Sequence, residues 1–249
     1  MKNLFRVPFL LLAIFTLAFS TIFPTYASAN SNTTVPIEAL SSKATVSSEQ
    51  LNPIVKNKNG AIIPMASSDV AVLTLFSVPS GSTNSSGGST GSNWGTHSFI
   101  TVKNVSLSNI SVGGLSGIAS NKTISVGTWG NKSENEGIFY NLEAKFISQN
   151  SYNNRVSRSM YLTQSQLNSV NSYIRSHDSW STLNNCSSFA VGLWNSVSSD
   201  TYTAGFPNTP QNLYNSLRDG AYTTNAAVPY DYLVYYSDEP NAPKRSLQF

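Results

Sequence analysis

Residues 180–190 read Trp180-Ser181-Thr182-Leu183-Asn184-Asn185-Cys186-Ser187-Ser188-Phe189-Ala190. The stretch predicts a helix that begins near Cys186, with Asn184 or Asn185 as a suitable N-cap. A thiol at a helix start meets unpaired backbone N–H groups and the positive end of the helix dipole, and both favour the thiolate. The same N–H groups would suit an oxyanion formed when sulfur attacks a carbonyl.

Cys186 is the only cysteine of the 249 residues, so the chain cannot form an internal disulfide. A lone thiol is expected to be either buried or used. Helical spacing places Cys186 on one apolar stripe with Phe189, Ala190 and Leu193, and free cysteine is a common core residue. Two interpretations therefore stay open, a nucleophile and an inert core residue.

A nucleophilic thiol needs a base, and the chain has two histidines. His97 stands where a Gly- and Ser-rich stretch, residues 79–93, meets an alternating strand pattern at 98–103. We expect that stretch to be a mobile loop, so His97 would face a cleft beside it. His177 lies in the last turn of a predicted helix, where a histidine interacts favourably with the helix dipole. The pattern therefore favours His97 as the base and a structural role for His177.

In the rest of the chain the spacing of apolar residues changes once, from the period of a strand to that of a helix. Alternating or apolar strand patterns come first, and helical spacing with clear caps follows. The predicted strands are 69–78, 98–103, 110–112, 123–129 and 137–142, the last continuing toward Phe146, with a closing strand at 231–236. The helices after Thr163 and Thr209 have a capping box with Gln166 and a proline at the first helical position, Pro210. This order predicts one α+β domain.

The chain resembles the circularly permuted papain-like families in the order of its elements. A histidine opens a strand, a β-meander follows, and a cysteine opens a helix in the run Asn185-Cys186-Ser187-Ser188-Phe189. These families include permuted NlpC/P60 relatives, lecithin:retinol acyltransferase-like proteins and PPPDE peptidases. The resemblance covers residues 94–200, and 70–236 more loosely. It implies an antiparallel meander or barrel packed against the helix of Cys186. It further implies that Cys186 is the nucleophile and His97 the base, as in uncharacterised secreted bacterial proteins of this kind.

These families often orient the histidine with a polar residue from a neighbouring strand. Asn131, directly after the strand 123–129, is our candidate for this third member. Ser125 and Thr128 compete with it, and a dyad without a third member is a further alternative.

The N-terminus predicts export. Lys2 and Arg6 precede an uncharged apolar run, and Ala27-Ser28-Ala29 is a small-x-small cleavage site, so we expect a signal peptide at 1–29 with cleavage after Ala29. The alternative is a retained anchor, although the run is shorter than the roughly 20 residues that span a bilayer. Residues 30–69 then resemble a pro-segment or disordered linker, 70–240 form the domain, and 241–249 are a polar tail.

The net charge and the absence of certain motifs limit which classes of binding partner are expected. Removing Lys2 and Arg6 leaves 13 Lys and Arg against 12 Asp and Glu, without a basic stripe, which argues against nucleic acid. The sequence contains neither zinc-ligand spacing nor a phosphate-binding loop, so we expect no metal and no cofactor. Stable membrane association is not expected after signal cleavage, and the oligomeric state stays open.

Two functions follow. The first is a secreted cysteine hydrolase, a peptidase, amidase or acyl-transfer enzyme, that acts on peptide or cell-wall peptide bonds. The alternative is a catalytically inactive surface or binding module on the same scaffold, which the polar, sparsely charged composition favours.

Overall fold

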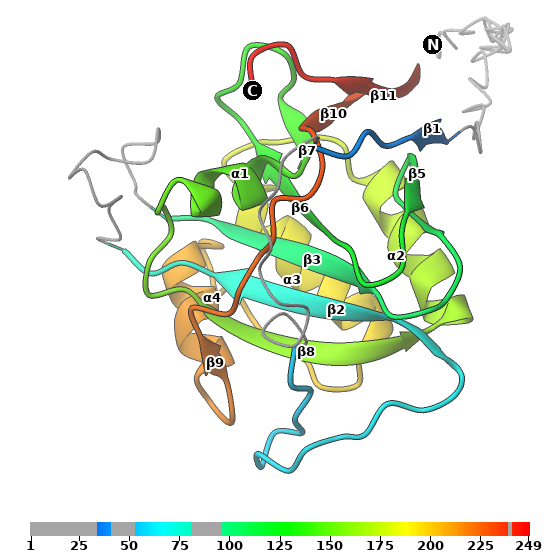
Figure 1. Cartoon of the computed structure of the whole chain (residues 1–249). Coiled ribbons are helices and arrows are strands. Elements are labelled where there is room, and N and C mark those ends of the chain that lie inside the picture. The colour runs from blue at the N-terminus through cyan, green and yellow to red at the C-terminus, as the bar shows by residue number, and fades with distance from the viewer. Residues whose placement is uncertain (1–33, 41–52, 81–95, 239–240) are drawn as a thin grey trace, which may run out of the picture. The chain divides into compact units, whose positions relative to one another are not determined.

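The computed structural model describes residues 34–40, 53–80, 96–238 and 241–249. Among these residues the fold is α+β, and its centre is an open, antiparallel sheet of eight strands in the order β11-β10-β7-β6-β3-β2-β8-β9 (Figure 1). The strands are β2 (Asp69–Ser77), β3 (Ser98–Asn104), β6 (Thr123–Trp129), β7 (Gly137–Tyr140), β8 (Val156–Thr163), β9 (Thr223–Thr224), β10 (Tyr235–Asp238) and β11 (Asn241–Arg245). The sheet does not close on itself, so it is not a barrel.

A second, small sheet joins β1 (Val35–Pro36), β5 (Leu115–Ile118) and β4 (Ile110–Val112), with β1 parallel to β5. Residues 30–69 were expected to lack fixed structure. The parts of this segment that the structure describes are instead ordered. Val55 is buried, and the backbone of Ile63 donates to its carbonyl. Residues 1–33 and 41–52, which include the predicted signal peptide, lie outside the described residues, as does most of the predicted loop 79–93.

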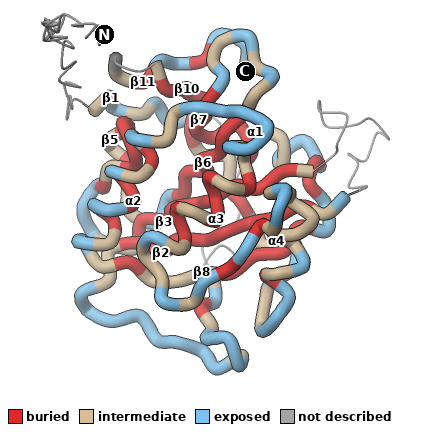
Figure 2. The backbone as a smooth tube through the Cα atoms, turned by 180° about the vertical axis from the view of Figure 1, so that it is seen from behind, coloured by how far each residue is buried: buried red, intermediate tan, exposed pale blue. Residues whose placement is uncertain are grey.

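Side chains alternate along the strands and build a core on each face of the large sheet. Ile100 and Val102 belong to one core with α2 (Gln164–Ser176), α3 (Cys186–Val197) and α4 (Pro210–Leu217). Phe99, directly before Ile100, belongs to the other core with α1 (Leu142–Ser148). Burial is concentrated along the central strands (Figure 2). None of the helices in the described ranges is long and apolar enough to cross a bilayer.

The three long helices begin where their caps predict. The Thr163 hydroxyl accepts from the backbone of Gln166 in a complete capping box, and Thr209 accepts from the backbone of Asn212 with a proline in the first turn. Asn185, rather than Asn184, caps α3. These side chains satisfy backbone donors that a helix start otherwise leaves unpaired.

Three predictions of local structure were wrong. The strand expected to run toward Phe146 ends at Tyr140, because Asn141 adopts φ 63° and α1 starts directly after it. The strand β8 was not predicted, although it pairs with β2 from Asp69 to Ser77. The expected polar tail includes β11, which pairs with β10, and the Glu134 carboxylate accepts from the backbone of Leu247 and Gln248.

Candidate active site

His97 precedes β3 and is almost completely buried, at 4% exposure. Its ring stacks on Trp129, with centroids 4.1 Å apart, and on Tyr152, 5.8 Å away. Phe99 adds a third stacked ring at 6.0 Å. Three stacked aromatic neighbours leave the buried imidazole little rotational freedom, so its two nitrogens point in fixed directions.

One of these nitrogens meets a buried carboxylate. Glu143, the second residue of α1, has no exposed surface, and its Oε1 lies 3.0 Å from His97 Nε2. The same oxygen accepts from Trp129 Nε1 at 2.9 Å, and Oε2 accepts from Ser125 Oγ at 2.9 Å. A carboxylate without access to water is stable only when it is paired and hydrogen-bonded. Its three partners meet that condition.

Glycine at position 127 is required by this pair. A Cβ atom on Gly127 would lie 2.2 Å from Glu143 Oε1 and 3.0 Å from His97 Nε2. The bare backbone of β6 therefore runs directly beside the carboxylate and the imidazole. A side chain at this position would force them apart.

Cys186 is the first residue of α3 and is partly exposed. Asn185, the residue before it, is the N-cap of this helix. The Asn185 side-chain oxygen accepts from the backbone of Ser187 at 2.9 Å and Ser188 at 3.3 Å, and its amide donates to the carbonyl of Asn208 at 2.8 Å. The backbone N–H groups of Ser187 and Ser188 are thus occupied by the cap, so these two are not left for an oxyanion.

The thiol lies near His97 at the end of β3 and β6 where the two strands are no longer paired. Pairing between β3 and β6 runs from Lys103 and Thr123 to Ile100 and Val126 and stops there. Beyond this point the Cys186 thiol lies close enough to the His97 side chain for each group to shift the pKa of the other. Because Nε2 faces Glu143, Nδ1 is the nitrogen left for the sulfur.

The three groups shift one another's proton affinities. Burial disfavours the charged imidazolium, but attraction to Cys186 and hydrogen bonds with Cys186 and Glu143 outweigh it and raise the pKa of His97 to about 9. Burial also opposes the thiolate, yet the charge and hydrogen bond of His97 and the backbone of Ser98 lower the pKa of Cys186 below its ordinary value. Both directions favour a thiolate–imidazolium pair.

A chain of buried hydroxyls anchors the thiol's helix to the sheet. Ser187 Oγ lies 3.2 Å from Ser98 Oγ, which lies 3.0 Å from Ser77 Oγ. Ser77 Oγ donates to the carbonyl of Pro210 at 2.7 Å. The starts of α3 and α4 are therefore fixed to the ends of β3 and β2.

Tyr152 is the second aromatic wall of His97 and has φ 59°, an unusual backbone conformation for a bulky residue. It is 1% exposed. Burial and the negative charges of Glu143 and Cys186 raise its pKa well above the ordinary value. The phenol therefore stays protonated and is a neutral wall of the site.

The predicted pair, His97 and Cys186, lies close enough for each to shift the pKa of the other, whereas Asn131 is an exposed residue of the loop after β6. Glu143 makes the hydrogen bond to His97 for which Asn131 was the candidate. Of the competitors, Ser125 donates to Glu143, and the buried Thr128 hydroxyl has no partner among the described residues.

His177 caps the C-terminus of α2, as expected for a structural role. Its Nδ1 lies 2.9 Å from the carbonyl of Tyr173 and 2.9 Å from Ser176 Oγ, and its ring stacks on Tyr173 with centroids 3.7 Å apart.

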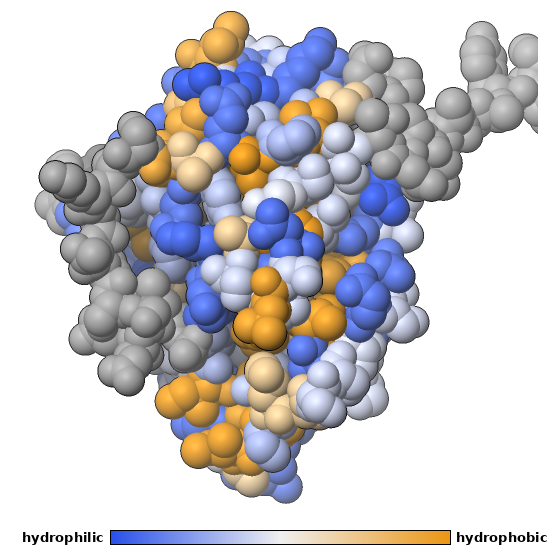
Figure 3. All heavy atoms as spheres, turned by 45° about the vertical axis from the view of Figure 1, so that its right-hand side comes forward, coloured by the Kyte–Doolittle hydropathy of each residue, from blue (hydrophilic) through white to orange (hydrophobic). Residues whose placement is uncertain are grey.

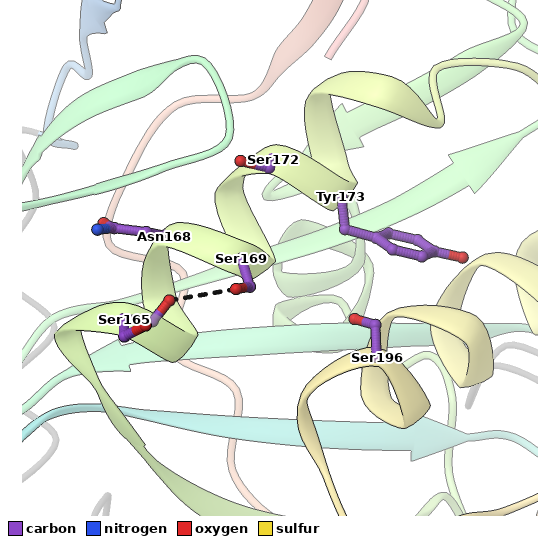
Figure 4. A pocket seen from close by; sticks show the side chains of 6 residues that line it. All are labelled: Ser165, Asn168, Ser169, Ser172, Tyr173 and Ser196. Atoms are coloured by element: carbon purple, nitrogen blue, oxygen red, sulfur yellow. Dashed lines mark hydrogen bonds between the residues drawn. The ribbon is translucent and has the colours of Figure 1, made fainter.

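A shallow hollow between α2 and α3 is separate from this site (Figure 4). Hydroxyl and amide groups line it together with one ring: Ser165, Asn168, Ser169, Ser172, Tyr173 and Ser196. Ser196 lies ten residues beyond Cys186 on α3, about 15 Å along the helix. Within the described ranges no three His, Cys, Asp or Glu residues gather as metal ligands.

Comparison with family models, curated proteins and solved structures gives no match for this chain.

Proposed function

We propose that the chain is a secreted cysteine hydrolase in which Cys186 is the nucleophile, His97 the general acid and base, and Glu143 the residue that orients His97. The observation that carries the proposal is the buried Glu143–His97 hydrogen bond of 3.0 Å, together with a Cys186 thiol close enough to His97 for the two groups to shift each other's pKa. A catalytically inactive module has no evident need to keep a thiol, an imidazole and a fully buried carboxylate together.

The chemistry has two balanced steps. The Cys186 thiolate attacks a carbonyl carbon, a C–S bond forms, and the bond to the leaving amine or alkoxide breaks as His97 gives it a proton. Water then attacks the thioester while His97 takes a proton from it, and the acid leaves as the thiolate is restored. Glu143 accepts from Nε2 throughout, so that Nδ1 keeps facing the sulfur and the imidazolium is stabilised.

The permuted papain-like arrangement belongs to this proposal. It is supported by the order of His97 before Cys186 and by the α3 helix, which brings the thiol to the strand end next to His97. The substrates proposed are peptide, isopeptide or activated ester carbonyls, with cell-wall peptide as a special case.

Trapping the acyl enzyme tests the proposal. The purified protein is incubated briefly with a neutral 4-nitrophenyl ester and analysed by mass spectrometry. We expect one acyl group on the peptide that contains Cys186, none in Cys186→Ser, and slower formation in His97→Ala. An inactive module would leave the folded protein unmodified while the denatured chain still reacts with iodoacetamide.

A further inference from the structure

Large apolar side chains are exposed on the two segments that border the start of α3. Trp180 is 37% exposed, Leu183 66% and Phe206 92%. The other exposed apolar side chains on described residues lie elsewhere. Ile54, Ile62, Ile63 and Met65 belong to the segment before β2, at the lower end of the view in Figure 3, and Leu107 and Leu247 are isolated.

Hydrogen bonds tie both segments to the residue beside the thiol. The Asn185 amide donates to the carbonyls of Thr182, at 3.1 Å, and Asn208, at 2.8 Å. The Asn208 amide donates in turn to the carbonyl of Leu183 at 3.4 Å. The backbone of Leu183 and that of Asn208, two residues after Phe206, are therefore tied to the start of α3, where Cys186 lies.

Trp180 extends this border to the histidine side of the site. A Cβ atom on Gly130 would lie 2.1 Å from Cδ2 of Trp180, so the indole lies directly against the bare backbone there. Gly130 follows Trp129, which stacks on His97. The apolar border thus runs from the thiol side to the imidazole side.

The two segments that carry Trp180, Leu183 and Phe206 have no charged side chains. Residues 179–185 and 201–209 contain neither acidic nor basic side chains. The nearby Asp178 is occupied, since its Oδ1 accepts from the backbone of Ile138 at 2.7 Å. A charged substrate group would find no charged partner on these two segments, whereas an apolar group would bury area favourably there.

We propose that Trp180, Leu183 and Phe206 form an apolar subsite for one large apolar side chain of a peptide-like substrate, next to the carbonyl that Cys186 attacks. The inference rests on the proposed function and specifies its substrate. Three partly exposed side chains offer roughly a few hundred Å², well below the roughly 800 Å² per partner of a stable protein interface. The occupant is therefore a side chain and not a folded protein.

Ester substrates that differ only in one side chain test the subsite. We compare kcat/KM for N-acetyl 4-nitrophenyl esters of phenylalanine, leucine, alanine and glutamate. The native protein should prefer the phenylalanine or leucine ester over the alanine ester by about tenfold or more, and the glutamate ester should be the poorest. The double variant Leu183→Ser/Phe206→Ser should bring the preference close to one, because kcat/KM for the phenylalanine and leucine esters falls.

Leu107→Ser/Leu247→Ser is the matched control, since it removes equally exposed apolar side chains away from the site, and it should keep the full preference. Equal rates for the alanine and phenylalanine esters would overturn the subsite while leaving the acyl-enzyme chemistry intact. A preference that survives in the double variant, or a preference for glutamate, would also overturn it. Failure of every ester to acylate Cys186 would instead reject the proposed function itself.

Discussion

Glu143 Oε1 lies 3.0 Å from His97 Nε2 inside the protein, with no part of the glutamate exposed to solvent. The carboxylate fixes the orientation of the imidazole and stabilises its positive charge. Since His97 lowers the pKa of the Cys186 thiol, the carboxylate acts on the thiol through His97. Glu143 is in this sense a positioning residue.

Glu143→Gln should keep the side-chain volume and remove the charge. The His97 pKa should fall below about 9, because the attraction and the hydrogen bond of the carboxylate are lost. We expect kcat/KM to drop by about 10²- to 10⁴-fold, the range supplied by general acid–base catalysis. The exposed Glu136, changed to Gln, is the matched control and should leave kcat/KM unchanged. A Glu143→Gln variant that folds and retains native kcat/KM would contradict this role.

Gly127→Ala should disturb the same pair by sterics alone. The added methyl would overlap Glu143 Oε1, so the carboxylate and the imidazole must move. Overpacking of this kind costs about 1–3 kcal/mol of unfolding free energy, and the thiol should lose its fast alkylation. Urea denaturation and iodoacetamide kinetics measure the two effects. Native stability together with native reactivity would mean that β6 does not approach the pair as described.

Proton affinity of the two histidines can be followed by NMR, because the chain contains only His97 and His177. His177→Gln assigns the remaining resonance to His97. We expect it to titrate near pH 9 in the native protein and at clearly lower pH in Cys186→Ala, which lacks the neighbouring thiolate. Activity should therefore rise through the lowered pKa of Cys186 and decline above about pH 9, as His97 loses its proton. A His97 resonance that does not respond to Cys186→Ala would contradict the contact.

Removing the Asn185 cap should affect both stability and chemistry. Loss of an N-cap side chain costs about 1 kcal/mol, and Asn185→Ala also removes the bond to Asn208. Thr163→Ala, on the cap of α2, is the control, because it should cost a similar free energy without changing the alkylation rate of Cys186. Equal alkylation rates in both variants would mean that Asn185 does not position the thiol.

The sequence predicted the helix of Cys186 and the strand after His97, because caps and alternation are local signals. The proximity of Cys186 to His97 was expected only from the resemblance to the permuted papain-like families. It did not predict β8, in which Arg158, a buried charge, interrupts the apolar pattern. Arg158 Nη2 lies 3.0 Å from Asp200 Oδ2, a partner 42 residues away that a local pattern does not reveal.

Glu143 was missed for a related reason. The segment after Tyr140 was interpreted as a continuing strand, and only the left-handed turn at Asn141 starts the helix that turns Glu143 inward. Asn is one of the few residues that adopt this conformation readily, so Asn141 followed by a Leu-Glu-Ala-Lys run was the available signal. The partners of Glu143 lie 14, 18 and 46 residues away, and only the folded sheet brings them together.

The alkylation rate of Cys186 as a function of pH tests the central claim most directly, because the chain has no other cysteine to react. We predict that iodoacetamide modifies the folded protein rapidly at pH 7, with a midpoint well below the roughly 8.5 of a free thiol. His97→Ala should move that midpoint upward and leave the protein folded. Labelling that is slow until denaturant is added, and equally slow in His97→Ala, would show that Cys186 is an inert core residue and would contradict the account.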